Sequence, residues 1–321
     1  MTVLITGGTG FIGAEIARQL VTQGARDIFI LHRRSNFQRL QDIDGQLHFV
    51  QADLGDVARI TEVVQQIQPE VIYHLGAVLT GPGEANPQAA IQTNVQGMVA
   101  LLEAARLNGV RQFLFASSIG AYGADIQEKM LTDVTLQRPF TIYGITKVFG
   151  EQLGAYYKRK YGLDFRGLRY PSIVGPGVKT PSVVQFTSWV IEECARGNPF
   201  TMTVTPETAV PLMYYKDAAQ AMIQLGQAPL ENIKTVNYLV DGLKPAPTVA
   251  QWAGTVRQAI PGATIDFAPD WGLQLILDQL LRPLDDSRAR AEWGWQPAYD
   301  QAAIVTDFLL ELQQHPERYG E

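Results

Sequence analysis

Short apolar runs alternate with longer amphipathic stretches along the first half of the chain. Runs that are apolar throughout, rather than alternating with polar residues, are typical of strands buried on both faces of a parallel sheet. The pattern therefore predicts an α/β fold of the Rossmann type, a doubly wound parallel sheet with helices on both faces. The apolar runs are Val3–Ile5, Ile28–Leu31, Leu47–Val50, Val71–Leu75, Gln112–Ala116 and Phe165–Leu168, and the helical stretches lie near residues 13–23, 56–67, 87–108 and 143–161.

This regular alternation ends near residue 168, and proline and glycine become frequent over residues 171–181. We therefore predict two domains. Residues 1–168 form a dinucleotide-binding domain, and residues 169–321 form mainly a smaller substrate-binding lobe, with some segments, about 216–227, returning to the first domain. Further helices are expected near 182–196, 216–227, 246–259, 271–281 and 299–314, and short strands near 198–205, 212–215 and 235–240.

A glycine-rich turn joins the first strand to the first helix. Thr6-Gly-Gly-Thr-Gly-Phe-Ile-Gly13 places Gly7, Gly10 and Gly13 directly after the apolar run. Glycines let the backbone approach a pyrophosphate, and the following helix N-terminus offers N–H groups and a positive dipole to the anion. An ordinary glycine turn has the same composition, but the second apolar run and the side chains at its end favour dinucleotide binding.

The residues after the second and third runs bear on the choice of cofactor. An acid after the second strand would bind the 2′-hydroxyl of NAD, whereas arginine can pair with the 2′-phosphate of NADP. Here the sequence is His32-Arg33-Arg34-Ser35, so Arg33 and Arg34 predict NADP, with NAD possible and a solvated basic turn as the alternative. Asp53-Leu54 follows the third run, where the carboxylate can accept from the adenine amino group or cap a helix.

Two stretches carry candidate chemistry. The run Phe113-Leu-Phe-Ala-Ser-Ser118 ends in hydroxyls, and Tyr143 and Lys147 lie four residues apart on the helical stretch that follows. Residues at i and i+4 share a helix face, and an ammonium near a phenol favours the phenolate and lowers the pKa of the tyrosine toward neutrality. The set predicts acid–base chemistry on an alcohol or carbonyl, with a surface helix pair as the alternative.

Composition and charge limit the kinds of partner that this protein can have. The chain has 321 residues, a net charge of −6 and a pI near 5.3, which argues against nucleic acid as a partner. A single cysteine, Cys194, and four scattered histidines predict neither a disulfide nor a metal site. No apolar run approaches the roughly 18 residues of a membrane span, and the first strand begins at residue 2, so we expect a cytoplasmic protein without a membrane partner.

Together these motifs resemble the extended short-chain dehydrogenase/reductase (NAD-dependent epimerase/dehydratase) superfamily. The likeness runs nearly end to end through the glycine turn, Asp53-Leu54, His74-Leu-Gly-Ala77, Asn94-Val-Gln-Gly, Ser117-Ser118, Tyr143-x-x-x-Lys147 and Arg169-Tyr-Pro171. Several stretches are most similar to the L-threonine 3-dehydrogenase branch, and Val174-Gly-Pro-Gly-Val-Lys179 also resembles D-erythronate-type dehydrogenases. Departures from the threonine branch include Ser172, where that branch has glycine, and the missing acid after the second strand.

The resemblance implies roles for individual residues. The catalytic set would be Ser118, rather than Ser117, with Tyr143 and Lys147. Residues implied at the cofactor are Gly7, Gly10, Phe11, Ile12, Gly13, Arg33, Arg34, Asp53, Leu54, Leu75, Gly76, Ala77, Asn94, Tyr143, Lys147, Tyr170, Pro171 and Ile173. Residues implied at the substrate are Thr80, Ser118, Ser172, Thr180 and Ser182.

Three functions are compatible with these motifs. The first is an NAD(P)-dependent dehydrogenase or reductase of a small polar hydroxy or keto compound. The second is a nucleotide-sugar epimerase or dehydratase with tightly bound cofactor, and the third is a dinucleotide sensor, which would not need an intact Ser-Tyr-Lys set. Between Arg169 and Asp217 the sequence offers only Lys179, Arg196 and Lys216 to meet a second pyrophosphate, so we expect a substrate without a nucleoside diphosphate.

A homodimer is also expected. The helices near 87–108 and 143–161 carry apolar residues on more than the stripe that covers the sheet. These residues are Val95, Met98, Val99 and Leu102 on one helix, and Val148, Phe149, Leu153, Tyr156 and Tyr157 on the other.

Overall fold

A seven-stranded parallel sheet organises the computed structural model, which describes residues 1–123, 125–180 and 182–319. Its strand order is β10-β6-β5-β4-β1-β2-β3, so the order reverses between β1 and β4. Ligands of such sheets bind at the carboxyl ends of the strands beside this reversal. The predicted doubly wound fold is confirmed. The strands are β1 (Thr2–Thr6), β2 (Asp27–His32), β3 (His48–Gln51), β4 (Val71–His74), β5 (Gln112–Ser118), β6 (Asp164–Tyr170) and β10 (Asn237–Leu239).

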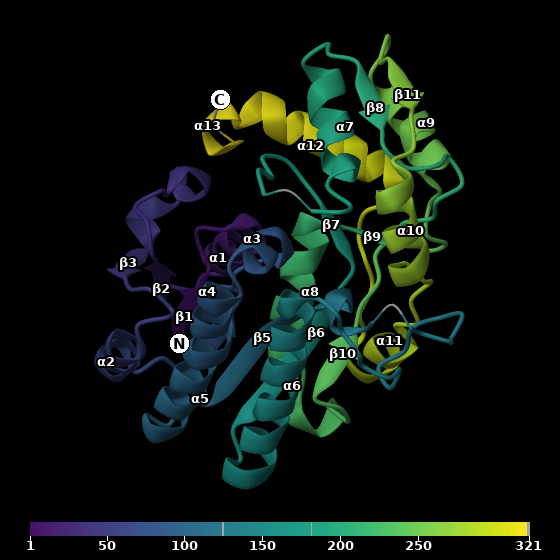
Figure 1. Cartoon of the computed structure of the whole chain (residues 1–321). Coiled ribbons are helices and arrows are strands. Elements are labelled where there is room, and N and C mark those ends of the chain that lie inside the picture. The colour runs from purple at the N-terminus through teal and green to yellow at the C-terminus, as the bar shows by residue number, and fades with distance from the viewer. Residues whose placement is uncertain (124, 181, 320–321) are drawn as a thin grey trace.

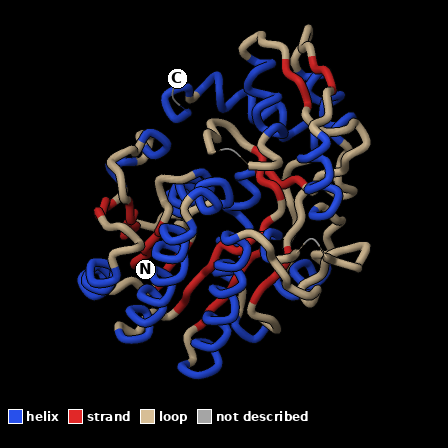
Figure 2. The backbone as a smooth tube through the Cα atoms, in the orientation of Figure 1, coloured by secondary structure: helices blue, strands red, loops and turns tan. Residues whose placement is uncertain are grey.

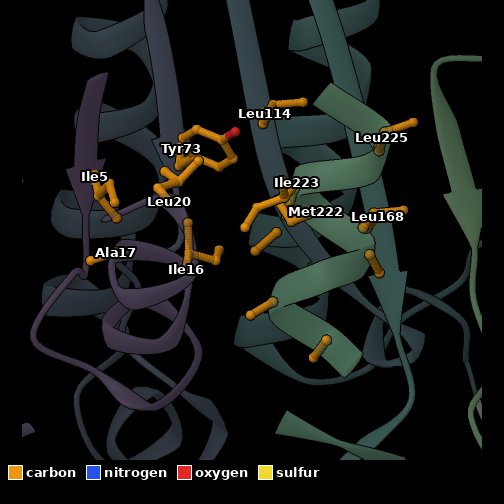
Figure 3. Close-up of a cluster of buried hydrophobic side chains, with 14 of the residues drawn as sticks. Ile5, Ile16, Ala17, Leu20, Tyr73, Leu114, Leu168, Met222, Ile223 and Leu225 are labelled. Carbon is orange, nitrogen blue, oxygen red and sulfur yellow. The ribbon is translucent and has the colours of Figure 1, made fainter. Parts of the chain in front are cut away.

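Helices cover both faces of the sheet (Figure 1). One face packs against α1 (Phe11–Thr22) and α8 (Tyr215–Gln227), and the other against α2 (Val57–Ile67), α5 (Gly97–Leu107) and α6 (Ile142–Tyr161). Successive strand residues point to opposite faces, so each apolar strand contributes to both cores. Figure 3 shows the first of these cores, in which Ile5 of β1, Ile16 and Leu20 of α1, and Met222 of α8 lie together.

A second lobe lies beside the carboxyl ends of the strands, and its short strands and helices are seen at the upper right of Figure 2. Two strand pairs, β7 (Ser172–Val174) with β9 (Leu212–Tyr214) and β8 (Phe200–Met202) with β11 (Ile265–Phe267), are both parallel. A separate core, which includes Val190, Trp252 and Phe308, holds this lobe together. Its helices are α7 (Phe186–Ala195), α9 (Val249–Ala259), α10 (Trp271–Leu280), α12 (Gln301–Gln314) and α13 (Pro316–Tyr319). Helix α11 (Ser287–Trp293) packs instead against β10 of the sheet.

The chain crosses between the lobes more than once. Helix α8 packs against α1 and β10 joins the sheet beside β6, although both follow the first strands of the second lobe in sequence. At the other end, α13 contacts the short 3-10 turn Gln38–Leu40 that follows β2. The C-terminal segment therefore lies against the loop between β2 and β3 (Figure 1).

Several elements differ from the sequence-based expectation. The single helix expected over 87–108 is divided into α4 (Pro87–Ala90), a π-helical turn (Ile91–Gln96) and α5, and α3 (Thr80–Ala85), β7, β11 and α11 were not predicted. Apart from α5, these pieces are three to seven residues long, so they are too short to show a hydrophobic period. Among the residues that the structure describes, no helix is both long and apolar enough to cross a membrane.

The expected dimer face is smaller than the sequence suggested. Met98, Leu102 and Tyr157 are buried against the sheet, so they are not available to a partner. Exposed apolar area remains at Val99 (41%) and Phe149 (37%). The homodimer itself stays a prediction.

Candidate active site

The glycine turn packs closely against the segment after β4, at the carboxyl ends of β1 and β4. Gly7 has φ +70, and a Cβ on it would lie 2.6 Å from the backbone nitrogen of Gly76. A Cβ on Gly13 would lie 2.3 Å from the carbonyl oxygen of Gly7. Side chains at these positions would clash with the backbone of the turn itself or of the segment after β4, so this close packing requires glycine. A turn of bare glycines leading into a helix fits the pyrophosphate that the sequence predicts.

Helix α1 begins directly after this turn with its N-terminus open. Gly10 occupies the N-cap without a side-chain hydrogen bond, and no acidic residue lies in the first turn. The N–H groups of the first turn, including Phe11 and Ile12, therefore remain for an anion. The Phe11 ring takes no part in this site and stacks on the ring of Tyr215, with ring centroids 5.4 Å apart.

The basic residues after β2 lie at the surface. His32 is the last residue of β2, and its buried ring packs edge-on against Phe37. Arg33 and Arg34 follow and are exposed, and Arg33 reaches Asp53 at 3.8 Å. Asp53 also accepts the backbone N–H of Gly55, so this carboxylate shapes the turn after β3.

The small residues after β4 are held by side chains from neighbouring elements. Thr6 accepts the backbone N–H of Gly76, and the Leu54 side chain packs where a Cβ of Gly76 would lie. Leu75 donates its N–H to the carbonyl of Thr6, and Ala77 follows half-buried. The backbone of this segment therefore lies beside the glycine turn, as the prediction requires.

Asn94 has protein partners at both ends of its amide. Its oxygen accepts from Val78 N at 2.7 Å, and its nitrogen donates to Val78 O and to Thr146 Oγ1. Both amide protons are thus used within the chain. Asn94 therefore fixes the loop after β4 to α6.

The three candidate catalytic residues come together where β5 ends. Ser118 closes β5, its Oγ accepts from Gly120 N at 3.1 Å, and it forms a hydrogen bond with the Tyr143 hydroxyl. Tyr143 and Lys147 lie one turn apart on α6, with the Lys147 ammonium 5.3 Å from the centre of the Tyr143 ring. Thr141 caps α6 by accepting from Gly144 N, which fixes where this helix begins.

Burial dominates the protonation of these groups. It raises the pKa of Tyr143 to about 12, although the hydrogen bond with Ser118 opposes the change, and it lowers the pKa of Lys147 to about 8. Contrary to the expectation from the sequence, the groups of this chain alone therefore do not lower the pKa of Tyr143 toward neutrality. Burial also lowers the pKa of His74 to about 3, so that ring is neutral and serves as a hydrogen-bonding partner of Thr6.

Two charged residues lie behind this centre: Glu151, which the sequence analysis did not name, and Arg169, which it named only as part of the Arg169-Tyr-Pro171 motif. Glu151 is fully buried on α6, and Arg169 of β6 donates two hydrogen bonds to it, of 2.9 and 2.6 Å. Ser117 also donates to Glu151, so its hydroxyl is occupied. This supports Ser118 as the hydroxyl that faces substrate. The spacing Lys147 to Glu151, again four residues, is the signal that could have revealed the carboxylate.

The residues proposed for substrate lie at the start of the second lobe and beside it. Thr80 begins α3, and Ser172 begins β7 with its N–H bonded to the carbonyl of Pro211. Thr180 is half-buried and Ser182 exposed. Among the implied cofactor residues, Pro171 and Ile173 follow the end of β6, while the Tyr170 hydroxyl donates to the carbonyl of Ala218 in the core.

A cavity of about 340 Å³ in the second lobe borders this segment at Pro211. Arg282, a basic residue outside the stretch between Arg169 and Asp217, lines this cavity. Glu207 and Asp278 line the same cavity, and the Arg282 guanidinium donates to the backbone carbonyls of Asp278 and Leu281. Within the described residues no group of three or more His, Cys, Asp and Glu side chains could hold a metal ion.

Comparison with known proteins agrees with this geometry. The model of a family described as the NAD dependent epimerase/dehydratase family matches residues 3–240. A mitochondrial L-threonine 3-dehydrogenase of Sus scrofa is 33% identical over 311 residues, covering 96% of this chain and 81% of that protein. The resemblance to the extended short-chain dehydrogenase/reductases is confirmed.

Solved structures show the same likeness. The L-threonine dehydrogenase from Clostridium difficile has a TM-score of 0.89 at 28% identity and covers 98% of both chains. The holo form of a GalE-like L-threonine dehydrogenase from Cupriavidus necator has a TM-score of 0.86 at 30% identity, covering 96% of this chain and 99% of that one.

Proposed function

Because the chain belongs to the NAD dependent epimerase/dehydratase family, we propose that it is an oxidoreductase that moves a hydride between a nicotinamide cofactor and a small polar hydroxy or keto compound. The convergence of Ser118, Tyr143 and Lys147 at the carboxyl end of β5 carries this proposal. A proton donor, a second hydroxyl and a buried cation lie together in the domain that carries the glycine turn, and they are the set that alcohol–carbonyl interconversion requires.

Each residue has a defined part in the proposed reaction. The Tyr143 hydroxyl exchanges a proton with the substrate oxygen, and Ser118 orients that oxygen by hydrogen bonding. Lys147 holds the cofactor ribose and stabilises the phenolate by its charge. The bound nicotinamide supplies the hydride acceptor or donor, and its oxidised ring adds a positive charge that favours the phenolate.

We propose NADP(H) as the preferred cofactor. No acid stands at the end of β2, and Arg33 and Arg34 are exposed at the edge where the adenosine ribose would lie. The contact of Arg33 with Asp53 is long and solvent-exposed, so it contributes little and leaves the guanidinium able to pair with a 2′-phosphate.

Titration of the protein with both cofactors tests this preference. We expect NADP⁺ to bind about ten- to a hundredfold more tightly than NAD⁺, which corresponds to one charge-assisted contact of roughly 1.5–3 kcal/mol. Arg33→Ala should reduce that ratio, whereas Arg26→Ala, an exposed arginine at the opposite end of β2, should not. Equal or tighter binding of NAD⁺ to the parent protein would show that the arginines serve only as solvated charges.

The proposed centre is tested by turnover. We expect dehydrogenase activity within a panel of short hydroxy acids, hydroxyamino acids including L-threonine, and sugars, assayed with each cofactor. Tyr143→Phe should reduce the rate by about 10²–10⁴ with cofactor binding nearly unchanged, since it removes one acid–base group. Tyr161→Phe, at the exposed end of the same helix, is the matched control. A Tyr143→Phe rate within about threefold of the parent would exclude the phenol as the acid–base group.

The alternative, a nucleotide-sugar epimerase or dehydratase, uses the same three residues and differs in what the second lobe binds. Its substrate carries a second pyrophosphate, which needs clustered arginines or a helix N-terminus. Between Arg169 and Asp217 the chain has only three basic residues, Lys179, Arg196 and Lys216. The ammonium of Lys216 already pairs with Asp307 and Glu311, so this stretch favours a small polar molecule over a diphosphate. Calorimetry with UDP, GDP and dTDP sugars decides between them, because micromolar binding of any of these would favour the epimerase.

A further inference from the structure

Three ionisable side chains follow one another along a single face of α6. Tyr143, Lys147 and Glu151 are spaced by four residues, so each lies about one helical turn from the next. Lys147 and Glu151 are almost completely buried, with 5% and 0% exposure. The proposed proton donor is therefore followed along the helix first by a buried cation and then by a buried anion.

Glu151 is held from three other segments of the chain. Its carboxylate accepts two hydrogen bonds from Arg169 of β6, one from Ser117 of β5 and one from Gln137 of the loop before α6. Arg169 in turn donates to the hydroxyl of Tyr122 and to the carbonyl of Asp133. The carboxylate is thus fixed at the junction of β5, β6 and α6, directly behind the strand end that carries Ser118.

Lys147 lacks an equally direct partner. Its ammonium donates to the carbonyl of Ala116 at 2.6 Å and lies 4.9 Å from the centre of the Phe115 ring, and no described carboxylate forms an ion pair with it. The ionisable groups around it are Tyr143 and Glu151 on α6, the neutral His74 on β4, and Arg169 on β6 beyond Glu151. Of these, Glu151 is the source of negative charge.

We propose that Glu151, fixed by Arg169, is a positioning residue that keeps Lys147 charged in the interior and holds the ends of β5 and α6 together. The inference rests on the proposed function for its meaning, because a neutral Lys147 would lack the positive charge that stabilises a phenolate. The geometry is specific, since the same carboxylate bonds Ser117, the neighbour of Ser118, and follows Lys147 by one turn.

The electrostatic consequence has a definite sign. Burial lowers the pKa of Lys147 to about 8, and the charge of Glu151 opposes this change. Replacing Glu151 with glutamine keeps the shape and removes the charge, which leaves the cations of Lys147 and Arg169 without their shared anion. A nearby opposite charge shifts a pKa by about 1–3 units. We therefore expect the pKa of Lys147 to fall by at least about one unit in Glu151→Gln.

The experiment follows the titration of Lys147 in the cofactor-free protein. Carbon-13 labelling of the lysine ε-carbons gives one NMR signal per lysine, and the Lys147 signal is the one lost in Lys147→Arg. Its midpoint should move to lower pH in Glu151→Gln. Ser117→Ala removes a hydrogen bond to Glu151 without changing charge, and Glu62→Gln makes the same chemical change on the exposed surface of α2, so both should leave the midpoint in place.

A double variant protects the test against misfolding of the single one. Glu151→Gln with Arg169→Met removes the buried pair as a unit, which is tolerated better than a lone buried charge. Since Glu151 acts on Lys147 more directly than Arg169 does, the midpoint should still lie below that of the parent. An unchanged midpoint in either variant would overturn the proposal.

Activity gives a second, separable result. If the protein turns over a substrate, the alkaline limb of kcat/KM should move to lower pH in Glu151→Gln, which a purely structural loss would not produce. If no substrate is found, the proposed function fails, while the NMR titration still decides whether Glu151 controls the charge of Lys147.

Discussion

Asp241 makes the stability of this protein depend on pH in a direction opposite to that of most carboxylates. It follows β10, is 2% exposed, and accepts the backbone N–H of Gly242 at 2.9 Å. Burial raises its pKa from 3.8 to about 7, while the charge of Lys244 opposes this change and the charge of Asp286 adds to it. Asp241 is therefore protonated in the folded protein at pH values where it is charged in the unfolded chain.

The sign and size follow from linkage. Between the two pKa values the folded state binds more protons than the unfolded state, so the contribution of Asp241 is present at low pH and is lost as pH rises toward about 7. A difference of about three pKa units corresponds to roughly 4 kcal/mol in the free energy of unfolding. Part of this stabilisation is already lost by about pH 5, so roughly 2–3 kcal/mol of it remains to be lost between pH 5 and pH 8.

Urea unfolding of the parent and of Asp241→Asn at a series of pH values measures this directly. The asparagine keeps the acceptor for Gly242 and cannot ionise. The free energy of Asp241→Asn relative to the parent should therefore rise by about 2–3 kcal/mol from pH 5 to pH 8. Asp44→Asn, on the exposed 3-10 turn Asp44–Gln46, provides the matched control. A relative free energy that stays constant with pH would refute the argument.

Three further outcomes are expected. Gly13→Ala places a Cβ 2.3 Å from the carbonyl oxygen of Gly7, so it should weaken cofactor binding at least about tenfold, as measured by calorimetry. Gly45 has open space around it, and Gly45→Ala should therefore bind the cofactor as tightly as the parent does. Phe149→Glu adds a charge to the exposed face of α6 and should convert the predicted dimer to a monomer by light scattering; a parent protein that is already monomeric at micromolar concentration would contradict the dimer. Arg39→Met removes two hydrogen bonds to carbonyls of the loop after β7. A charge-assisted hydrogen bond contributes about 1.5–3 kcal/mol, so the melting temperature should fall by several degrees. An unchanged melting temperature would show that these hydrogen bonds add nothing to stability.

The sequence determined the parts of this protein that depend on local periodicity. Strands buried on both faces read as continuous apolar runs, and each run of the first half lies within or beside a strand of the sheet. The glycine turn was equally clear, because only residues without a Cβ fit between Gly7, Gly13 and the segment after β4. Tyr143 and Lys147 could be paired from spacing alone, since a helix brings residues four apart onto one face.

Only the tertiary structure decided which polar groups meet across the sheet. Glu151 and Arg169 are 18 residues apart on different elements, and no local pattern distinguishes a buried ion pair from two surface charges. The same holds for Met98 and Leu102, whose burial depends on how closely α5 packs against the sheet. The tertiary structure also decided the protonation of Tyr143, because burial by neighbours distant in sequence raises the pKa of this tyrosine. Periodicity is a property of one segment, whereas burial and charge pairing are properties of the assembled fold, and the sequence shows directly only the first.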